Sequence, residues 1–219
     1  MGKVLIIGAS RGIGLELARQ YQARGDVVVA VCRKGNAQLD SLGLRVIEGI
    51  DVAVAEDVRT LADAVAGTAF DILLHNAGIL YADTIESLDF DKMLEQFRVN
   101  ALGPLRVVRA LLESLHEGAK VGIVSSRVGS IADNSSGNNY GYRTSKCAVN
   151  MIAANLTHDL KPYGVALALL HPGFVATDMT GGRGSSPEEA AAGMIVRMDE
   201  LTLSSSGGFW HANGERLPW

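Results

Sequence analysis

The sequence of 219 residues contains few cysteines, prolines and aromatic residues. Its two cysteines, Cys32 and Cys147, lack a Cys-x-x-Cys spacing, so they predict neither a disulfide framework nor a zinc site. The five histidines are scattered along the chain, and we predict no metal site. Two isolated thiols fit a reducing compartment best, and the location we expect is cytoplasmic.

Long apolar runs and blocks of like charge are also missing. Apolar stretches such as residues 165–170 are far shorter than the roughly 18 residues that a membrane helix needs. The apolar residues 4–9 lead directly into Ser10 and Arg11 without a signal-peptide cleavage region. The net charge is −4, and no five like charges stand together. Such a surface does not favour polyanions, so we expect no nucleic acid and no membrane as partners.

The composition is that of a globular protein, with 47% hydrophobic and 20% charged residues. A chain of this length can build one hydrophobic core, and no linker or long repeat divides it. We therefore predict a single domain over residues 1–219 that contains both a cofactor site and a substrate site.

Short runs rich in Val, Ile and Leu predict buried strands, and longer segments with helical spacing predict helices. The strands are expected at 3–7, 26–32, 44–49, 70–75, 120–125, 164–171 and 207–210. The helices are expected at 12–24, 34–42, 55–66, 89–115 and 141–161, with a last one after Ser186. This alternation predicts an α/β fold, with a parallel sheet of about seven strands between two layers of helices.

A glycine-rich turn follows the first strand in "GASRGIG". Gly8, Gly12 and Gly14 lead directly into a helix. Glycine permits a tight turn and close backbone approach, and the free N–H groups at a helix start can bind a pyrophosphate. The turn predicts a dinucleotide site, although an empty turn or a site for another nucleotide also fits this motif alone.

The stretch "YGYRTSK" offers two tyrosines for one catalytic role. Residues four apart lie about 400° apart around a helix, so Tyr142 and Lys146 share one face, whereas Tyr140 points elsewhere. A tyrosine with a pKa of about 10 exchanges protons poorly at neutral pH. A cation about 4 to 5 Å away would lower that pKa by about 2 to 3 units. We therefore predict Tyr142 as the catalytic acid, assisted by Lys146.

Taken in order, these motifs resemble the short-chain dehydrogenase/reductase family over nearly the whole chain. The glycine spacing G-x-x-x-G-x-G is followed by "NAG" at 76–78, Tyr142 with Lys146, and "PGFVAT" at 172–177. The resemblance implies a Rossmann-type, doubly wound, three-layer α/β/α fold. It also implies an NADPH-dependent oxidoreductase that reversibly reduces an aldehyde or ketone to an alcohol. The compact length resembles the carbonyl-reductase branch, with a small-molecule carbonyl or alcohol as substrate.

The resemblance also implies the catalytic roles. Tyr142 would protonate the carbonyl oxygen while Ser126 hydrogen-bonds it, and Lys146 would also bind the nicotinamide ribose. Neighbouring strand residues point to opposite faces, and the second serine of "SSR" matches the family, so we choose Ser126 over Ser125. Tyr142 follows Ser126 by sixteen residues, more than the family commonly has. The additional residues fall in the polar loop 131–141, so we expect this longer spacing to change the entrance of the substrate site and not the chemistry.

Asn100 stands four residues before Pro104. Because proline has no N–H, the main-chain carbonyl of Asn100 loses its helical partner, and we expect a bend there. In the resembling family, an Asn at this point holds a water that links Lys146 to solvent. The competing interpretation is a mid-helix Asn beside a structural kink.

The end of the second strand favours NADP(H) over NAD(H). Cys32 stands where NAD-preferring folds usually place an acid, and Arg33 and Lys34 follow it. An arginine can bind a 2′-phosphate through charge-assisted hydrogen bonds, and Arg11 can reach the same region. With the resemblance, the predicted cofactor contacts are Gly8, Ser10, Arg11, Gly12, Ile13, Gly14, Arg33, Lys34, Asp51, Val52, Asn76, Ala77, Gly78, Tyr142, Lys146, Pro172, Gly173, Val175 and Thr177.

Several alternatives stay open. Epimerases and dehydratases of the extended family also use Tyr-x-x-x-Lys, but they have a different glycine spacing and a longer chain. A non-catalytic NADP-binding sensor or signalling protein would keep the same motifs and would differ only in turnover. The apolar face of residues 148–156 leaves a homodimer or homotetramer open, and the Gly/Ser-rich loop at 180–186 is a candidate lid.

Overall fold

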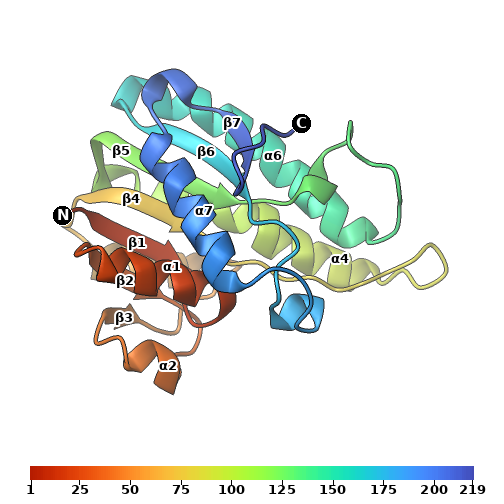
Figure 1. Cartoon of the computed structure of the whole chain (residues 1–219), viewed down its shortest axis with the longest axis horizontal. Coiled ribbons are helices and arrows are strands. Elements are labelled where there is room, and N and C mark those ends of the chain that lie inside the picture. The colour runs from red at the N-terminus through yellow and green to blue at the C-terminus, as the bar shows by residue number, and fades with distance from the viewer.

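A parallel sheet of seven strands forms the centre of the computed structural model, which describes residues 1–219 (Figure 1). The strand order is β3-β2-β1-β4-β5-β6-β7, and all neighbours pair in parallel. The strands are β1 (Lys3–Ile7), β2 (Val27–Val31), β3 (Arg45–Ile47), β4 (Phe70–His75), β5 (Leu115–Val124), β6 (Ala166–His171) and β7 (Gly208–His211). The strand order reverses between β1 and β4, which confirms the predicted doubly wound fold.

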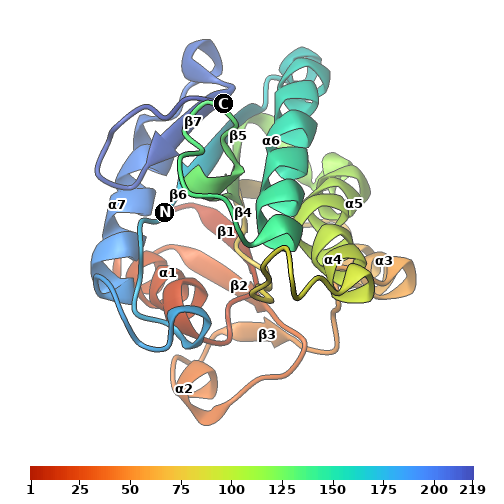
Figure 2. The same ribbon diagram turned by 90° about the vertical axis from the view of Figure 1, so that its right-hand side faces the viewer.

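Helices cover both faces of the sheet, as Figure 2 shows. They are α1 (Gly12–Ala23), α2 (Ala37–Asp40), α3 (Ala55–Ala64), α4 (Phe90–Phe97), α5 (Gly103–Ala110), α6 (Tyr140–Leu160) and α7 (Pro187–Glu200). Leu5 and Ile7 of β1 pack in one core with α3, α5 and α6, whereas Val4 and Ile6 pack in a second core with α1 and α7. Alternate residues of a strand face opposite ways, so both faces of the sheet are apolar.

The segment predicted as one helix over 89–115 is divided into several elements. α4 ends at Phe97, a π-helical segment spans Arg98–Leu102, and α5 begins at Gly103 with Pro104 in its first turn. The helix is therefore irregular at Asn100, and the bend expected there stays a prediction. The predicted helical end at 115 is wrong, because Leu115 pairs with Phe70 as the first residue of β5.

Other boundaries differ less. α2 and β3 are shorter than the predicted segments 34–42 and 44–49. α7 begins as expected, since the Ser186 side chain accepts a hydrogen bond from the Glu189 N–H at 3.1 Å, and β7 forms the predicted seventh strand. No helix combines the length and the apolar character needed to cross a membrane.

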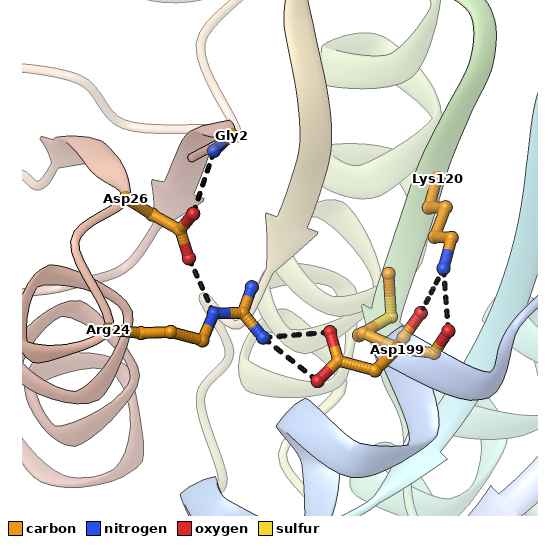
Figure 3. A network of polar contacts seen from close by, with 6 residues as sticks. Gly2, Arg24, Asp26, Lys120 and Asp199 are labelled. Carbon is orange, nitrogen blue, oxygen red and sulfur yellow. Dashed lines mark hydrogen bonds and ion pairs between the residues drawn. The ribbon is translucent and has the colours of Figure 1, made fainter.

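A network of polar contacts joins five elements, β1, β2, α1, α7 and β5, at the end of the sheet where the strands begin (Figure 3). Asp26, just before β2, accepts from the Gly2 N–H at 2.8 Å and from Arg24 Nε at 2.6 Å. Arg24, after α1, also donates to both carboxylate oxygens of Asp199 in α7, at 2.8 Å each. Lys120 of β5 donates to two main-chain carbonyls near the end of α7, at 2.8 Å each. The network fixes α1 and α7 to the sheet at this edge.

Candidate active site

A cleft of about 1700 Å³ opens at the opposite edge, where the strands end. It crosses the boundary between β1 and β4, where open α/β sheets bind their ligands. The predicted catalytic and cofactor residues all line this cleft, except Gly14 and Asn100. Gly14 lies in the first turn of α1 against the Gly8 carbonyl, and Asn100 is buried behind the cleft wall.

The glycine turn is packed tightly against the "NAG" segment. Gly8 has a φ of +86°, and a Cβ there would lie 2.7 Å from the Ala77 nitrogen. A Cβ on Gly14 would clash with the carbonyl oxygen of Gly8, and that oxygen accepts a hydrogen bond from Asn76 Nδ2 at 2.9 Å. The Asn76 amide therefore holds the turn in place. α1 begins without a side-chain cap, so its first N–H groups are available to a phosphate.

Two cations stand at the end of β2, beside the buried Cys32. Arg33 Nη1 lies 4.0 Å from Asp51 Oδ2, and both side chains are partly exposed to solvent. Lys34 lines the same part of the cleft. Arg11 pairs instead with Asp178 at 2.8 Å, in the segment after β6. Arg33 and Lys34 thus form the positive end of the cleft, and Arg11 joins the glycine turn to the 178–184 segment.

The two adjacent serines after β5 have different surroundings. Ser125 is buried, and its hydroxyl donates to Asn150 Oδ1 at 2.6 Å. Ser126 lines the cleft next to Tyr142, and its Oγ accepts a long bond of 3.4 Å from the Val128 N–H. Ser125 is therefore held in a structural contact, while Ser126 presents its hydroxyl to the cleft.

Tyr142 lines the cleft from the first turn of α6. Tyr140, the first residue of that helix, is more exposed and does not line the cleft. Burial raises the pKa of Tyr142 to about 12, against the smaller lowering effect of a hydrogen bond with Ser126. The prediction that this pKa would fall toward neutral pH is wrong for this structure, because the loss of solvation outweighs the neighbouring polar groups.

Lys146 is almost fully buried, with 4% of its surface exposed. Its Nζ donates to the main-chain carbonyl of Val124 at 2.9 Å and lies 5.7 Å from the centre of the Tyr142 ring. Burial lowers the pKa of Lys146 to about 8, because the charged ammonium loses solvation. The lysine and the tyrosine are thus neighbours on one helix face, as their spacing predicts.

The Asn100 side chain joins three segments behind the cleft. Its Oδ1 accepts from the Ile79 N–H at 2.8 Å, and its Nδ2 donates to the Ile79 carbonyl at 2.8 Å and to Ser145 Oγ at 3.0 Å. The residue is 1% exposed. The side chain therefore fixes the loop after β4 to α6, whereas the expected role of its main-chain carbonyl stays a prediction.

His171 is a cleft residue that the sequence patterns do not indicate. His171 lines the cleft and contacts His211 edge to face, with ring centres 4.9 Å apart. Burial lowers the pKa of His171 to about 3, so this imidazole is neutral at physiological pH. Its position just before "PG" is the only sequence signal that could have indicated it. His75, the last residue of β4, is buried and lies outside the cleft.

Comparisons with known proteins agree with this geometry. A family model described as short chain dehydrogenase matches residues 2–188. The chain is 46% identical to 1-hydroxy-2-glutathionyl-2-methyl-3-butene dehydrogenase of Rhodococcus sp. (strain AD45), over 100% of both chains. It is 40% identical to the C-signal of Myxococcus xanthus, over 74% of this chain and 100% of that protein.

A solved carbonyl reductase from Pseudomonas aeruginosa PAO1, in complex with NADP, superposes over 100% of both chains. The TM-score is 0.89, and the sequences are 32% identical. The chain therefore belongs to the short-chain dehydrogenase/reductase family and is an oxidoreductase of that family.

Proposed function

We propose that this protein is an NADP(H)-dependent reductase of aldehydes or ketones that also oxidises the corresponding alcohols. One observation carries the proposal: Ser126, Tyr142 and Lys146 line the same cleft as the glycine turn. A proton donor and a phosphate-binding turn thus share one cavity. We also propose that residues 1–219 act as one domain, and the two free cysteines support a cytoplasmic location.

The cleft residues fit NADP(H). The closely packed turn at Gly8 and the uncapped start of α1 suit a pyrophosphate. At the end of β2, Arg33 and Lys34 suit a 2′-phosphate, and Cys32 brings no carboxylate that would repel it. The NADP bound by the Pseudomonas reductase supports this assignment. When bound, NADPH supplies the hydride, and we propose that it is preferred over NADH.

Tyr142 supplies the proton in the reducing direction. With a pKa of about 12, its hydroxyl keeps its proton at neutral pH. A carbonyl oxygen that gains negative charge becomes more basic than a phenolate, so proton transfer from Tyr142 to that oxygen is favourable. The Ser126 hydroxyl donates to the same oxygen and orients it. Tyr142 and Ser126 thus stabilise the charge that develops in the transition state.

Lys146 stabilises the phenolate that remains on Tyr142. Its pKa of about 8 leaves about nine in ten molecules charged at pH 7. The ammonium is fixed by its hydrogen bond to Val124 and lies beside the tyrosine ring in a poorly solvated site, where its charge acts strongly. Lys146 therefore favours the state that follows proton transfer.

The Rhodococcus relative suggests one substrate class for the oxidising direction. Its name describes a hydroxyl on one carbon and a glutathionyl group on the next. We propose that a primary alcohol beside a glutathione thioether is also a substrate here. Arg183 in the cleft wall donates only to the Thr180 carbonyl, at 3.3 Å, and so offers a partner for a glutathione carboxylate.

Turnover tests this function. Purified protein is assayed with NADPH and with NADH against a broad panel of aldehydes and ketones, and with NADP⁺ against alcohols that include a 2-glutathionyl primary alcohol. We expect turnover in at least one panel and a lower KM for NADPH than for NADH. The C-signal relative makes a signalling function the second candidate. NADPH binding without turnover in either panel would favour that candidate and contradict the proposal.

A further inference from the structure

The helix that carries Tyr142 is capped by a carboxylate from a distant part of the chain. The N-cap of α6, Asn139, has a φ of 50° and a ψ of 47°, and its side chain makes no capping bond. Asp83 takes over this role: its Oδ1 accepts from the Tyr140 N–H at 2.5 Å, and its Oδ2 accepts from the Gly141 N–H at 3.1 Å. Its main-chain carbonyl also accepts from the Asn139 N–H at 2.9 Å.

Asp83 belongs to the loop between β4 and α4, which begins with the cleft-lining "NAG" segment at 76–78. The same loop is joined to α6 a second time, because Asn100 bonds both Ile79 and Ser145. Tyr142 lies between these two attachments, one at the first turn of α6 and one at Ser145. The loop that lines the cofactor side of the cleft thus holds the catalytic helix on both sides of the tyrosine.

Packing against α4 limits the remaining freedom of this turn. A Cβ on Gly141 would lie 2.9 Å from Met93 Cγ, so the turn already contacts α4 closely. The fully buried Gln96 of α4 accepts from the Tyr81 N–H at 2.9 Å and so fixes the same loop. α4 therefore blocks movement of the turn to one side, and the Asp83 carboxylate, only 8% exposed, holds it in place.

We propose that Asp83 is a positioning residue for Tyr142. It joins the first turn of α6 to the loop on the cofactor side, so that the phenol is held in the orientation needed for proton transfer. This inference rests on the proposed function. Without the carboxylate, the first turn loses the acceptors for two of its N–H groups and frays. Displacement of a catalytic group by about 1 Å can lower a rate about 100-fold.

The test compares Asp83→Ala and Asp83→Asn with a matched control, Asp89→Ala. Asp89 caps the neighbouring α4 by accepting from the Lys92 N–H at 3.1 Å, and it is exposed. We expect Asp83→Ala to lower kcat by about 10- to 100-fold, with a KM for NADPH within about threefold of the parent. Asp83→Asn keeps one acceptor and should be intermediate. Asp89→Ala should stay within about twofold of the parent in kcat, because its helix start does not carry Tyr142.

The primary isotope effect with NADPH deuterated at the transferred position separates positioning from loss of folded protein. A misplaced Tyr142 makes the chemical step slower, so the effect should rise in both Asp83 variants. An unchanged kcat would overturn the inference. A fall in kcat that only matches a loss of NADPH-binding sites, with an unchanged isotope effect, would also overturn it.

Hydrogen exchange over residues 140–146 gives a second test that does not depend on turnover. In Asp83→Asn, which conserves size and is the safer variant for folding, exchange in this segment should be faster than in Asp89→Ala. Equal protection would contradict the capping role. A parent enzyme that turns over no carbonyl or alcohol would refute the proposed function instead, and the exchange result would still decide whether Asp83 orders the helix start.

Discussion

The Nζ atom of Lys146 lies 5.7 Å from the centre of the Tyr142 ring, and both side chains belong to the same face of α6. Burial moves their two pKa values toward the neutral forms, to about 12 for the tyrosine and about 8 for the lysine. A protonated phenol beside a charged ammonium suits proton donation. The cleft is therefore arranged for carbonyl reduction at neutral pH.

The rate of carbonyl reduction should depend on pH through Lys146. Below pH 8 the ammonium is charged and supports the phenolate; above its pKa of about 8 the charge is lost. We expect kcat at saturating NADPH and carbonyl to be level between about pH 6 and 8, and to fall by up to tenfold per pH unit above that. A kcat that is constant up to pH 10 would show that the charge of Lys146 is not needed.

Lys146→Met should abolish most activity and stabilise the fold. Because burial lowers the lysine pKa from 10.5 to about 8, its charged form costs the folded state about 3 kcal/mol at neutral pH. Loss of the bond to Val124 offsets about 1 to 2 kcal/mol of that gain. Thermal unfolding at pH 7 should therefore show a Tm several degrees above the parent.

The difference in stability between the parent and Lys146→Met should also depend on pH. Below pH 8 Lys146 is protonated in both the folded and the unfolded parent, so the full cost of burying its charge lowers the stability of the parent. Between pH 8 and about 10.5 the unfolded chain binds more protons, so the stability of the parent rises with pH. The gap to Lys146→Met should narrow over this window, and a constant gap would contradict the assigned pKa.

Arg33→Ala combined with Lys34→Ala should remove the preference for NADPH. Each cation supplies a charge-assisted contact to the 2′-phosphate, so the KM for NADPH should rise by about tenfold or more, while that for NADH changes by less than about twofold. Arg45→Ala is the control, since Arg45 bonds the Ala64 carbonyl outside the cleft. An equal rise in the KM for NADPH and for NADH would show that these cations do not bind the 2′-phosphate.

Arg24→Ala should weaken the fold without changing catalysis. Arg24 joins Asp26 and Asp199 at the edge of the sheet opposite the cleft, but its side chain is 39% exposed, so we expect a loss of only about 1 kcal/mol. Differential scanning calorimetry should show a Tm about 2 to 4 °C lower, with kcat unchanged. Arg59→Ala, which removes an exposed pair with Glu56, should have almost no effect. Equal shifts in the two variants would mean that the network acts as ordinary surface charge.

Local patterns were sufficient to predict most of the fold. Strands buried on both faces read as continuous Val, Ile and Leu runs, so β1, β4 and β6 were found at nearly their observed bounds. The predicted helix ends too late, at 115: Leu111 and Leu115 are both buried, and two apolar residues four apart fit a helix as well as the start of a strand. Only the pairing of Leu115 with Phe70 separates the strand from the helix, and that pairing is a tertiary contact.

In the active site too, local patterns predict some features, whereas others depend on tertiary packing. Helical spacing was enough to place Tyr142 beside Lys146, and the motif order indicated the residues that line the cleft. The pKa of Tyr142 was mispredicted because burial depends on the packed structure and not on spacing. The capping role of Asp83 cannot be predicted from the sequence, because 57 residues separate Asp83 from Tyr140, whose N–H donates to its carboxylate. An acid in a polar loop carries no local sign of the helix it caps.

The most direct measurement compares Tyr142→Phe with the parent in NADPH-dependent reduction of the best carbonyl in the panel. The variant keeps the ring and removes only the hydroxyl, so folding and NADPH binding should be nearly unchanged. We expect kcat to fall by at least about 100-fold, as for loss of a general acid. A Tyr142→Phe protein that reduces the carbonyl as fast as the parent would contradict the assignment of Tyr142 as the proton donor.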